Sequence, residues 1–199
     1  MDSLTVLFFG RPGSGKGTQM RSLHKHLVGK KVGEIVPFEW APLIRSFTEG
    51  DSRIQRQAKT AIDKGERLPL FLAPTLWLPV FESTPENAHL LVDGVPRHKI
   101  EGELFHSLLS FYRGTRVDVI NLEVPEQISR LRLQQRGEAE GRSDDLTEES
   151  IQKRLDWFVT DTLPLLDFFR QNALYRVHDI DGTQGRDDVA QAIKDSVLP

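Results

Sequence analysis

The chain contains no cysteine, so it forms no disulfide and offers no thiolate to a zinc ion. No apolar run approaches the roughly 18 residues that a membrane-spanning helix needs. Neither sign of charge dominates, because 26 basic residues stand against 29 acidic ones and the formal net charge is −3. That balance gives no reason to expect nucleic-acid binding. These absences favour a globular protein, which we expect to be cytoplasmic.

The length of 199 residues suffices for one domain with small inserts and a sizeable core. Residues 4–9 form the first apolar run, and no basic segment precedes them, which predicts a strand rather than a secretion signal. Further strands are expected at residues 34–38, 88–92, 117–123 and 174–180. Helical patterns separate these runs, which favours an α/β fold with a five-stranded parallel sheet covered on both faces.

Two segments exceed what a simple alternation of strands and helices requires. Residues 41–81 carry three helical patterns where one crossover helix would suffice. We expect residues 39–71 to be an insert that covers a substrate. Residues 136–145 are polar, contain two glycines and are bracketed by arginines, and they lie between two helical patterns. The whole chain, residues 1–199, is otherwise expected to form one domain.

A glycine-rich loop follows the first strand directly. Residues 10–18 read GRPGSGKGT, and Met20, Leu23 and Leu27 recur after them at helical spacing. Between a strand and a helix, such a loop points backbone N–H groups and the positive end of the helix dipole at a polyphosphate. Lys16 can reach the β- and γ-phosphates. The loop predicts a nucleoside triphosphate site, and a glycine-rich turn without a ligand is the alternative.

Asp93 ends the third apolar run, at the edge of the sheet where ligands bind in open α/β folds. An acid there, across from Lys16, would hold the water shell of a Mg²⁺ ion bound to the triphosphate. Alternatively, Asp93 only starts the turn before Gly94. Gly17 stands where the general phosphate-loop pattern has a serine or threonine, and Thr18 follows one residue later.

Several arginines lie at glycine turns or beside acidic turn pairs. Phosphoryl transfer spreads negative charge over the transferred group, so catalysis is mainly positioning and cationic clamping. Arginine suits this task because its planar fork bonds two oxygens at once. For any single arginine, a solvated helix face is the alternative. The candidates are Arg45, Arg97, Arg132, Arg136, Arg142 and Arg154.

Three regions of the chain, in order, resemble the motifs of adenylate kinases and their nucleoside monophosphate kinase relatives. The first is the phosphate loop GRPGSGKGTQ of residues 10–19, and the second is DGVPR of residues 93–97, with Val95 where the family has phenylalanine. The third is the series RLQQRG, GRSDD and KRL within residues 132–155. The resemblance covers nearly the whole chain. It implies an enzyme of nucleotide biosynthesis that transfers the γ-phosphoryl group of Mg·ATP to a nucleoside monophosphate, AMP by default.

The resemblance also implies the parts of such an enzyme. Residues 39–71 would bind the monophosphate, and residues 136–145 would be a short lid without zinc, closed with the help of Asp144 and Asp145. The ATP-binding residues would be Gly13, Ser14, Gly15, Lys16, Gly17, Thr18, Arg132 and Arg136. The monophosphate-binding residues would be Trp40, Arg45, Ile62, Leu68, Gly94, Arg97 and Glu101. The catalytic residues would be Lys16, Asp93, Arg97, Arg136, Arg142 and Arg154. We expect a monomer that binds small nucleotides and neither nucleic acid nor membranes.

Two positions depart from the family on the acceptor side. Trp40 stands where the family has a threonine near the acceptor base, and Glu101 stands where adenylate kinases use a glutamine to read adenine. An ionised glutamate only accepts hydrogen bonds, which suits the N–H donors of guanine, or the amine of cytosine, better than adenine N1. Alternatively, Glu101 faces solvent at the start of a helix. A kinase acting on GMP, CMP or a non-nucleotide acceptor therefore stays open, as does a nucleotide-binding protein without catalysis.

Overall fold

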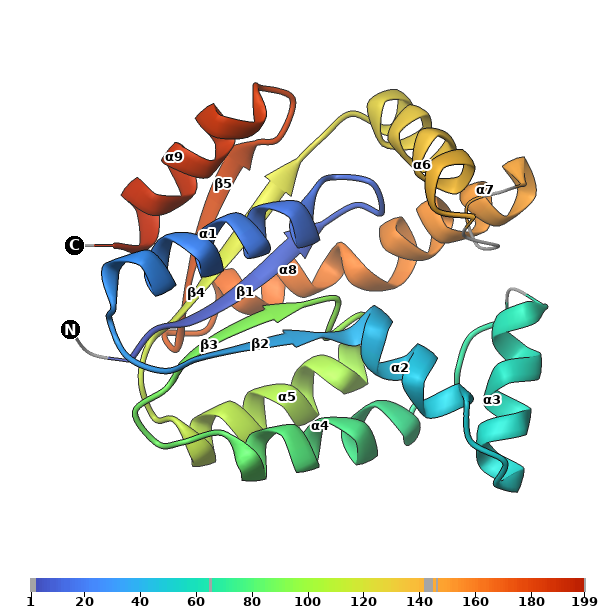
Figure 1. Ribbon diagram of the computed structural model, residues 1–199, viewed down its shortest axis with the longest axis horizontal. Helices are drawn as coiled ribbons and strands as arrows, with labels where there is room; N and C mark the ends of the chain where they lie inside the picture. The colour runs from blue at the N-terminus through green and yellow to red at the C-terminus, as the bar shows by residue number, and fades with distance from the viewer. Residues whose placement is uncertain (1–2, 65, 142–144, 146, 199) are drawn as a thin grey trace.

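A parallel sheet of five strands forms the centre of the part of the chain that the structure, a computed structural model, describes: residues 3–64, 66–141, 145 and 147–198. The strand order is β2-β3-β1-β4-β5 (Figure 1). All four neighbouring pairs are parallel. The strands are β1 (Thr5–Gly10), β2 (Ile35–Glu39), β3 (His89–Asp93), β4 (Val117–Glu123) and β5 (Tyr175–Asp181). The predicted α/β fold class is confirmed.

Four of the predicted strands lie one residue further along the chain than expected, and only β4 has the expected bounds. Apolar side chains mark where a strand is buried, but the hydrogen-bonded ladder continues past them. Gly10 pairs with Leu122, and Asp93 pairs with Phe8 and Glu39. Polar residues and glycine therefore occupy the carboxyl edge of the sheet, where ligands bind in this class of fold.

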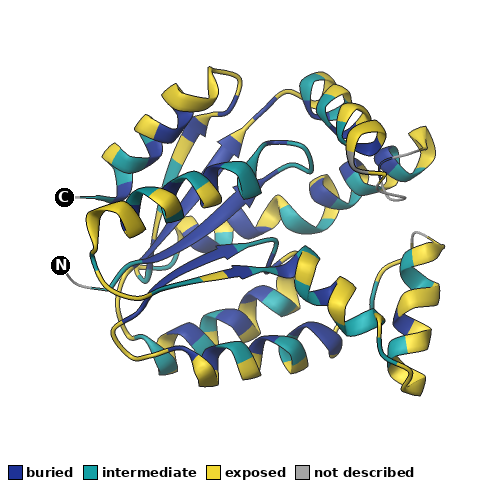
Figure 2. Cartoon of the chain, in the orientation of Figure 1, coloured by how far each residue is buried: buried dark blue, intermediate teal, exposed yellow. Residues whose placement is uncertain are grey.

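The two faces of the sheet carry different helices. On one face, α1 (Lys16–Lys30) and α9 (Arg186–Val197) cover side chains such as Phe8. On the other, α4 (Leu72–Ser83), α5 (Lys99–Tyr112) and α8 (Pro164–Arg170) cover neighbours such as Phe9. Successive side chains of a strand point to opposite faces, so β1 feeds both cores and is buried along its length (Figure 2). Met20, Leu23 and Leu27 are buried on α1 as their spacing predicts.

Residues 39–71, predicted as an insert, contain α2 (Trp40–Thr48) and α3 (Arg53–Asp63). The third predicted helix of this region is α4, which packs on α5 through an edge-to-face contact between Trp77 and Phe105, 5.0 Å between centroids. Ser52 and Gln55 form a capping box that starts α3. Figure 1 shows α3 away from the sheet, on the side where the strands end, while both chain termini lie at the opposite end.

The predicted short lid, residues 136–145, begins inside a helix. Its first five residues complete α6 (Glu126–Glu140), and Gly141 caps that helix with a left-handed φ of 63°. The next described helix, α7 (Glu148–Trp157), continues into the π-helix η2 (Phe158–Thr162) and then α8. Arg142 and Asp144 lie outside the described residues. No helix in the described ranges has the length and apolar character needed to cross a membrane.

Candidate active site

The loop between β1 and α1 is shaped by glycines that no other residue could replace without strain. Gly13 has φ of 79°, and a Cβ there would lie 2.6 Å from the carbonyl oxygen of Ser129 on α6. Gly15, with φ of 101°, precedes α1, which starts with no side-chain cap and no acid in its first turn. The first N–H groups of α1 and the positive end of its dipole are therefore available to an anion held in the loop.

Lys16 lies over this loop, where its Nζ donates to the carbonyl oxygens of Gly10 (2.8 Å) and Arg11 (2.9 Å). Burial lowers the pKa of Lys16 from 10.5 to about 8, although the negative charge of Asp93 acts in the opposite direction. The positive charges that lower this pKa further belong to Arg97, Arg154 and Arg136. The structure thus brings together five of the six predicted catalytic residues, since only Arg142 lies outside the described chain.

Asp93 stands beside Lys16 at the end of β3. Its Oδ1 is buried and has no hydrogen-bond partner within the described residues. Its Oδ2 would lie 3.2 Å from a Cβ at position 17, and the Nη1 of Arg21 would lie equally close. A side chain at position 17 would therefore lie in close contact with Asp93 and Arg21, which glycine avoids. A buried carboxylate oxygen without a partner fits a Mg²⁺ ion bound through water. The described residues contain no cluster of three direct metal ligands.

Asp145 connects the arginines of α6 and α7. Its side chain is completely buried, and it accepts a hydrogen bond from the Nε of Arg136 over 2.7 Å. The Nη1 of Arg154 forms a second ion pair with the same carboxylate. The Nη2 of Arg136 is buried and finds no partner among the described residues. An unpaired guanidinium nitrogen next to Lys16 is suited to an anionic ligand.

The DGVPR turn after β3 holds the acceptor-side residues together. The Nε of Arg97 donates to the carbonyl oxygen of Gly94 over 2.6 Å. A Cβ at Gly94 would lie 3.1 Å from the Cβ of Trp40, whose side chain is 7% exposed and belongs to the core. Trp40 therefore packs beneath the turn, and its contact with an acceptor stays a prediction.

Glu101 lies in the first turn of α5, where its Oε2 accepts the backbone N–H of Arg97 over 2.7 Å. Burial raises the pKa of Glu101, while the hydrogen bond and charge of Arg97 and the nearby His98 act against this rise. The carboxyl group is thus turned toward the DGVPR turn rather than toward open solvent.

The remaining acceptor residues lie on the segment 39–71. Arg45 is exposed on α2, and its charge is not among those that affect the pKa of Lys16. Ile62 and Leu68 are half-buried against the core cluster. Arg45 thus lies on the surface of α2, and its role with the acceptor phosphate stays a prediction.

Arg132 and Arg11 complete the surroundings of the loop. The guanidinium of Arg132 donates twice to the carbonyl oxygen of Gly182, 3.1 Å for each bond, so it braces the turn after β5. Arg11 was not predicted as a site residue from the sequence. Its guanidinium lies over the ring of Phe158, 5.2 Å from the ring centroid. Its position inside the loop was the only signal available, because the partner on η2 is far away in sequence.

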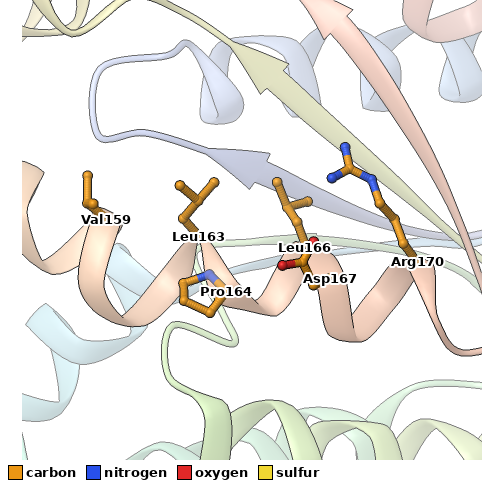
Figure 3. Close-up of a pocket in the computed structure, with 6 residues that line it drawn as sticks. All are labelled: Val159, Leu163, Pro164, Leu166, Asp167 and Arg170. Carbon is orange, nitrogen blue, oxygen red and sulfur yellow. The ribbon is translucent and has the colours of Figure 1, made fainter.

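A separate groove of about 360 Å³ lies along η2 and α8, and Figure 3 shows its side chains on consecutive turns. It is lined by Val159, Leu163, Pro164, Leu166, Asp167 and Arg170. None of these is a predicted site residue.

A phosphate loop at the carboxyl edge of a parallel sheet, with an acid and several arginines around its lysine, defines a nucleotide-dependent phosphotransferase. Comparison with known proteins specifies the family. The adenylate kinase family model matches residues 8–174. The adenylate kinase of Porphyromonas gingivalis is 33% identical over 192 residues, which cover 96% of this chain and 93% of that protein. That of a Cyanothece species is 34% identical over 189 residues, covering 95% and 92% respectively. The chain belongs to the adenylate kinase family.

Proposed function

We propose that this protein transfers the γ-phosphoryl group of ATP to AMP and forms two molecules of ADP. The observation that supports this most strongly is the group of Lys16, Asp93, Arg97, Arg136 and Arg154 at the carboxyl edge of the sheet. These side chains concentrate positive charge, of which the carboxylates of Asp93 and Asp145 offset a part, and the site attracts further negative charge. Two bound phosphate chains would supply that charge.

On the donor side, the loop and the start of α1 would hold the ATP phosphates by backbone N–H groups, with Lys16 on the β- and γ-phosphates. Lys16 would then exchange its two carbonyl partners for phosphate oxygens. Asp93 would hold Mg²⁺ through water, and the ion would neutralise charge on the triphosphate. Arg136, fixed by Asp145, would direct its buried Nη2 at the transferred group.

On the acceptor side, Arg97 and Arg45 would hold the phosphate of AMP, and Arg154 would lie between the two phosphate groups. An oxygen of the AMP phosphate attacks the γ-phosphorus, and the bond from that phosphorus to the β–γ bridging oxygen breaks. No side chain needs to act as a base, because this oxygen is already anionic. The protein supplies alignment and positive charge.

Residues 39–71 would bind the monophosphate, and residues 136–145 would close over the donor. Closure would keep water from the γ-phosphoryl group, which would otherwise be hydrolysed. Since one chain supplies groups for both nucleotides, we further propose a monomer that works in the cytoplasm.

Glu101 is the residue that bears on the acceptor base. Its neutral form offers an O–H donor to adenine N1 while Oε2 still accepts from Arg97, as a glutamine would. Its ionised form only accepts and suits guanine. Burial raises the pKa of Glu101, which extends the neutral form to higher pH than for an exposed glutamate and favours AMP.

Phosphoryl transfer from ATP to AMP, GMP, CMP and UMP, measured side by side at one pH, tests the proposal. We expect AMP to give the highest kcat/KM. A Lys16→Ala variant that stays folded by circular dichroism should lose nearly all transfer. A higher kcat/KM for GMP than for AMP would show that GMP is the preferred acceptor. If no monophosphate were turned over, the kinase function would be refuted.

A further inference from the structure

The acceptor segment, residues 39–71, contacts the π-helix η2 and the end of α7, the helix that carries Arg154. The phosphate chemistry does not require this contact. Arg67, on the irregular connection after α3, places its Nη2 2.6 Å from the Oδ2 of Asp161. The same guanidinium lies over the ring of Trp157, 5.0 Å from its centroid. The side chain of Asp161 is 19% exposed, so solvent screens this pair less than a fully exposed one. One arginine therefore makes an ion pair and a cation–π contact with a single helical segment.

The same segment is also fastened to other parts of the site. The hydroxyl of Thr162 donates to the carbonyl oxygen of Arg97 over 2.9 Å. Phe158 is buried beneath the guanidinium of Arg11 in the phosphate loop and packs on Phe9 of β1. Helix α7 runs directly into η2 and carries Arg154. The segment from Trp157 to Thr162 thus contacts the phosphate loop, the DGVPR turn and the acceptor segment.

A π-helix within an α-helix is uncommon and often marks a functional position. Here it lies between α7 and α8, and its side chains reach elements that hold different substrates. Arg67 is next to Leu68, a predicted acceptor residue that is half-buried against the core. A contact at Arg67 therefore fixes the backbone from which Leu68 extends. Arg67 itself is half-exposed and does not belong to the core, so packing does not explain its position.

We propose that Arg67, Trp157 and Asp161 form a clasp that holds residues 66–71 against η2 and so positions the acceptor segment relative to Arg97 and Arg154. The three are positioning residues, because they act through the backbone around Leu68 and through Thr162. The clasp rests on the proposed function for its effect on AMP. Its existence as a contact does not depend on that function.

Steady-state kinetics with the full chain test the effect. Because the clasp combines an ion pair and a cation–π contact, Arg67→Ala is expected to raise KM for AMP about fivefold to tenfold, with KM for ATP within about twofold of wild type. Arg67→Lys keeps the charge and should restore most of the affinity. Asp161→Asn removes the ion pair but keeps the cation–π contact, so it should raise KM for AMP by less than Arg67→Ala does. The double variant should be no worse than Arg67→Ala alone, because that substitution already removes the ion pair. Lys59→Ala, which removes an exposed cation from α3 of the same segment, is the matched control and should leave both KM values unchanged.

A readout without turnover separates the clasp from the proposed function. The emission of Trp157, taken as the difference between wild type and Trp157→Phe, should become more sensitive to acrylamide in Arg67→Ala but not in Lys59→Ala. An unchanged KM for AMP in both single variants would overturn the clasp, as would multiplied effects in the double variant or unchanged quenching. If wild type turned over no monophosphate, only the proposed function would fail, because the quenching comparison would still decide whether the clasp forms.

Discussion

The Nε of Arg136 and the buried carboxylate of Asp145 are 2.7 Å apart, and the same carboxylate pairs with Arg154. An anion that the protein itself supplies therefore holds together two arginines that would otherwise repel each other. Because Asp145 has no exposed side-chain surface, its charge is compensated mainly by its neighbours rather than by water.

Replacing Asp145 with asparagine should therefore harm both stability and catalysis. Removing one partner of a buried ion pair typically costs about 3–5 kcal/mol, and the retained amide should limit the loss to about 2–3 kcal/mol. We expect kcat to fall about tenfold or more, because Arg136 and Arg154 lose their fixed orientation. Urea unfolding and steady-state kinetics measure the two effects. The pair of Arg130 and Glu148, in which the glutamate side chain is exposed, is the control: Glu148→Gln should change the unfolding free energy by no more than about 1 kcal/mol. Equal effects of the two substitutions would contradict the role of Asp145.

The pH dependence of ATP use should follow Lys16. Its folded pKa of about 8 lies below the usual 10.5, so the free enzyme loses this positive charge as pH rises through 8. We expect kcat/KM for ATP to fall above about pH 8, since this ratio reports groups of the free enzyme. Folding stability should change in the opposite direction, because between pH 8 and 10.5 the unfolded chain binds more protons and stability rises with pH. A kcat/KM that stays flat to pH 9.5 would show that Lys16 keeps its proton.

Substitution of Gly13 should be far more harmful than substitution of another glycine nearby. An alanine Cβ at Gly13 would lie 2.6 Å from the carbonyl oxygen of Ser129 and would need a left-handed backbone. We expect Gly13→Ala to destabilise by about 2–4 kcal/mol and to abolish ATP binding. Gly29, inside α1, has nothing within 4 Å of the same position, so Gly29→Ala should stabilise by about 0.5–1 kcal/mol. Thermal unfolding and ATP titration compare the two, and similar losses in both would disprove the packing argument.

The preference for AMP should depend on the protonation of Glu101. Burial penalises its ionised form, so the folded pKa lies above that of the unfolded chain. At low pH, Glu101 is fully neutral and its contribution to the free energy of unfolding is fully present. Both decline as pH rises through the folded pKa. We therefore expect kcat/KM for AMP relative to GMP to decline over the same range. The ratio in Glu101→Gln should not vary with pH, because an amide keeps both a donor and an acceptor. The charged side chains that act on Glu101 are Arg97 and His98. The ratio of kcat/KM for AMP to that for GMP should therefore be measured both below and above neutral pH. Identical profiles for the two proteins would exclude Glu101 as the residue responsible.

Much of this architecture could be predicted from the sequence because it follows local rules. Apolar runs located every strand to within one residue, and the spacing of Met20, Leu23 and Leu27 identified the buried face of α1. The loop around Lys16 was readable because strand, glycines and helix are contiguous. Asp93 was found because a parallel sheet brings the ends of its strands to one edge.

Contacts between distant elements could not be predicted in the same way. Any of the acidic residues could have paired with Arg67, and nothing in the sequence singles out Asp161. The cap that Glu101 forms with the backbone of Arg97 was equally hidden, because the direction of a side chain in the first turn of a helix depends on its neighbours. The burial of Trp40 beneath Gly94 could not be read from the sequence either, because it depends on the packing of α2 against the sheet.

Helix α6 makes close backbone contacts at two points. Near its start, Ser129 lies against Gly13 of the phosphate loop, and near its end, Gly137 lies against the backbone of Asp145. A Cβ added at either glycine would lie 2.6 Å from the carbonyl oxygen of the facing residue. One residue added between these two contacts would rotate the later residues of the helix by about 100° around its axis and turn Arg136 away from its present position. Protein engineers who wish to graft a longer loop, an affinity tag or a sensor domain onto this enzyme should therefore keep it out of the stretch between Ser129 and Gly137.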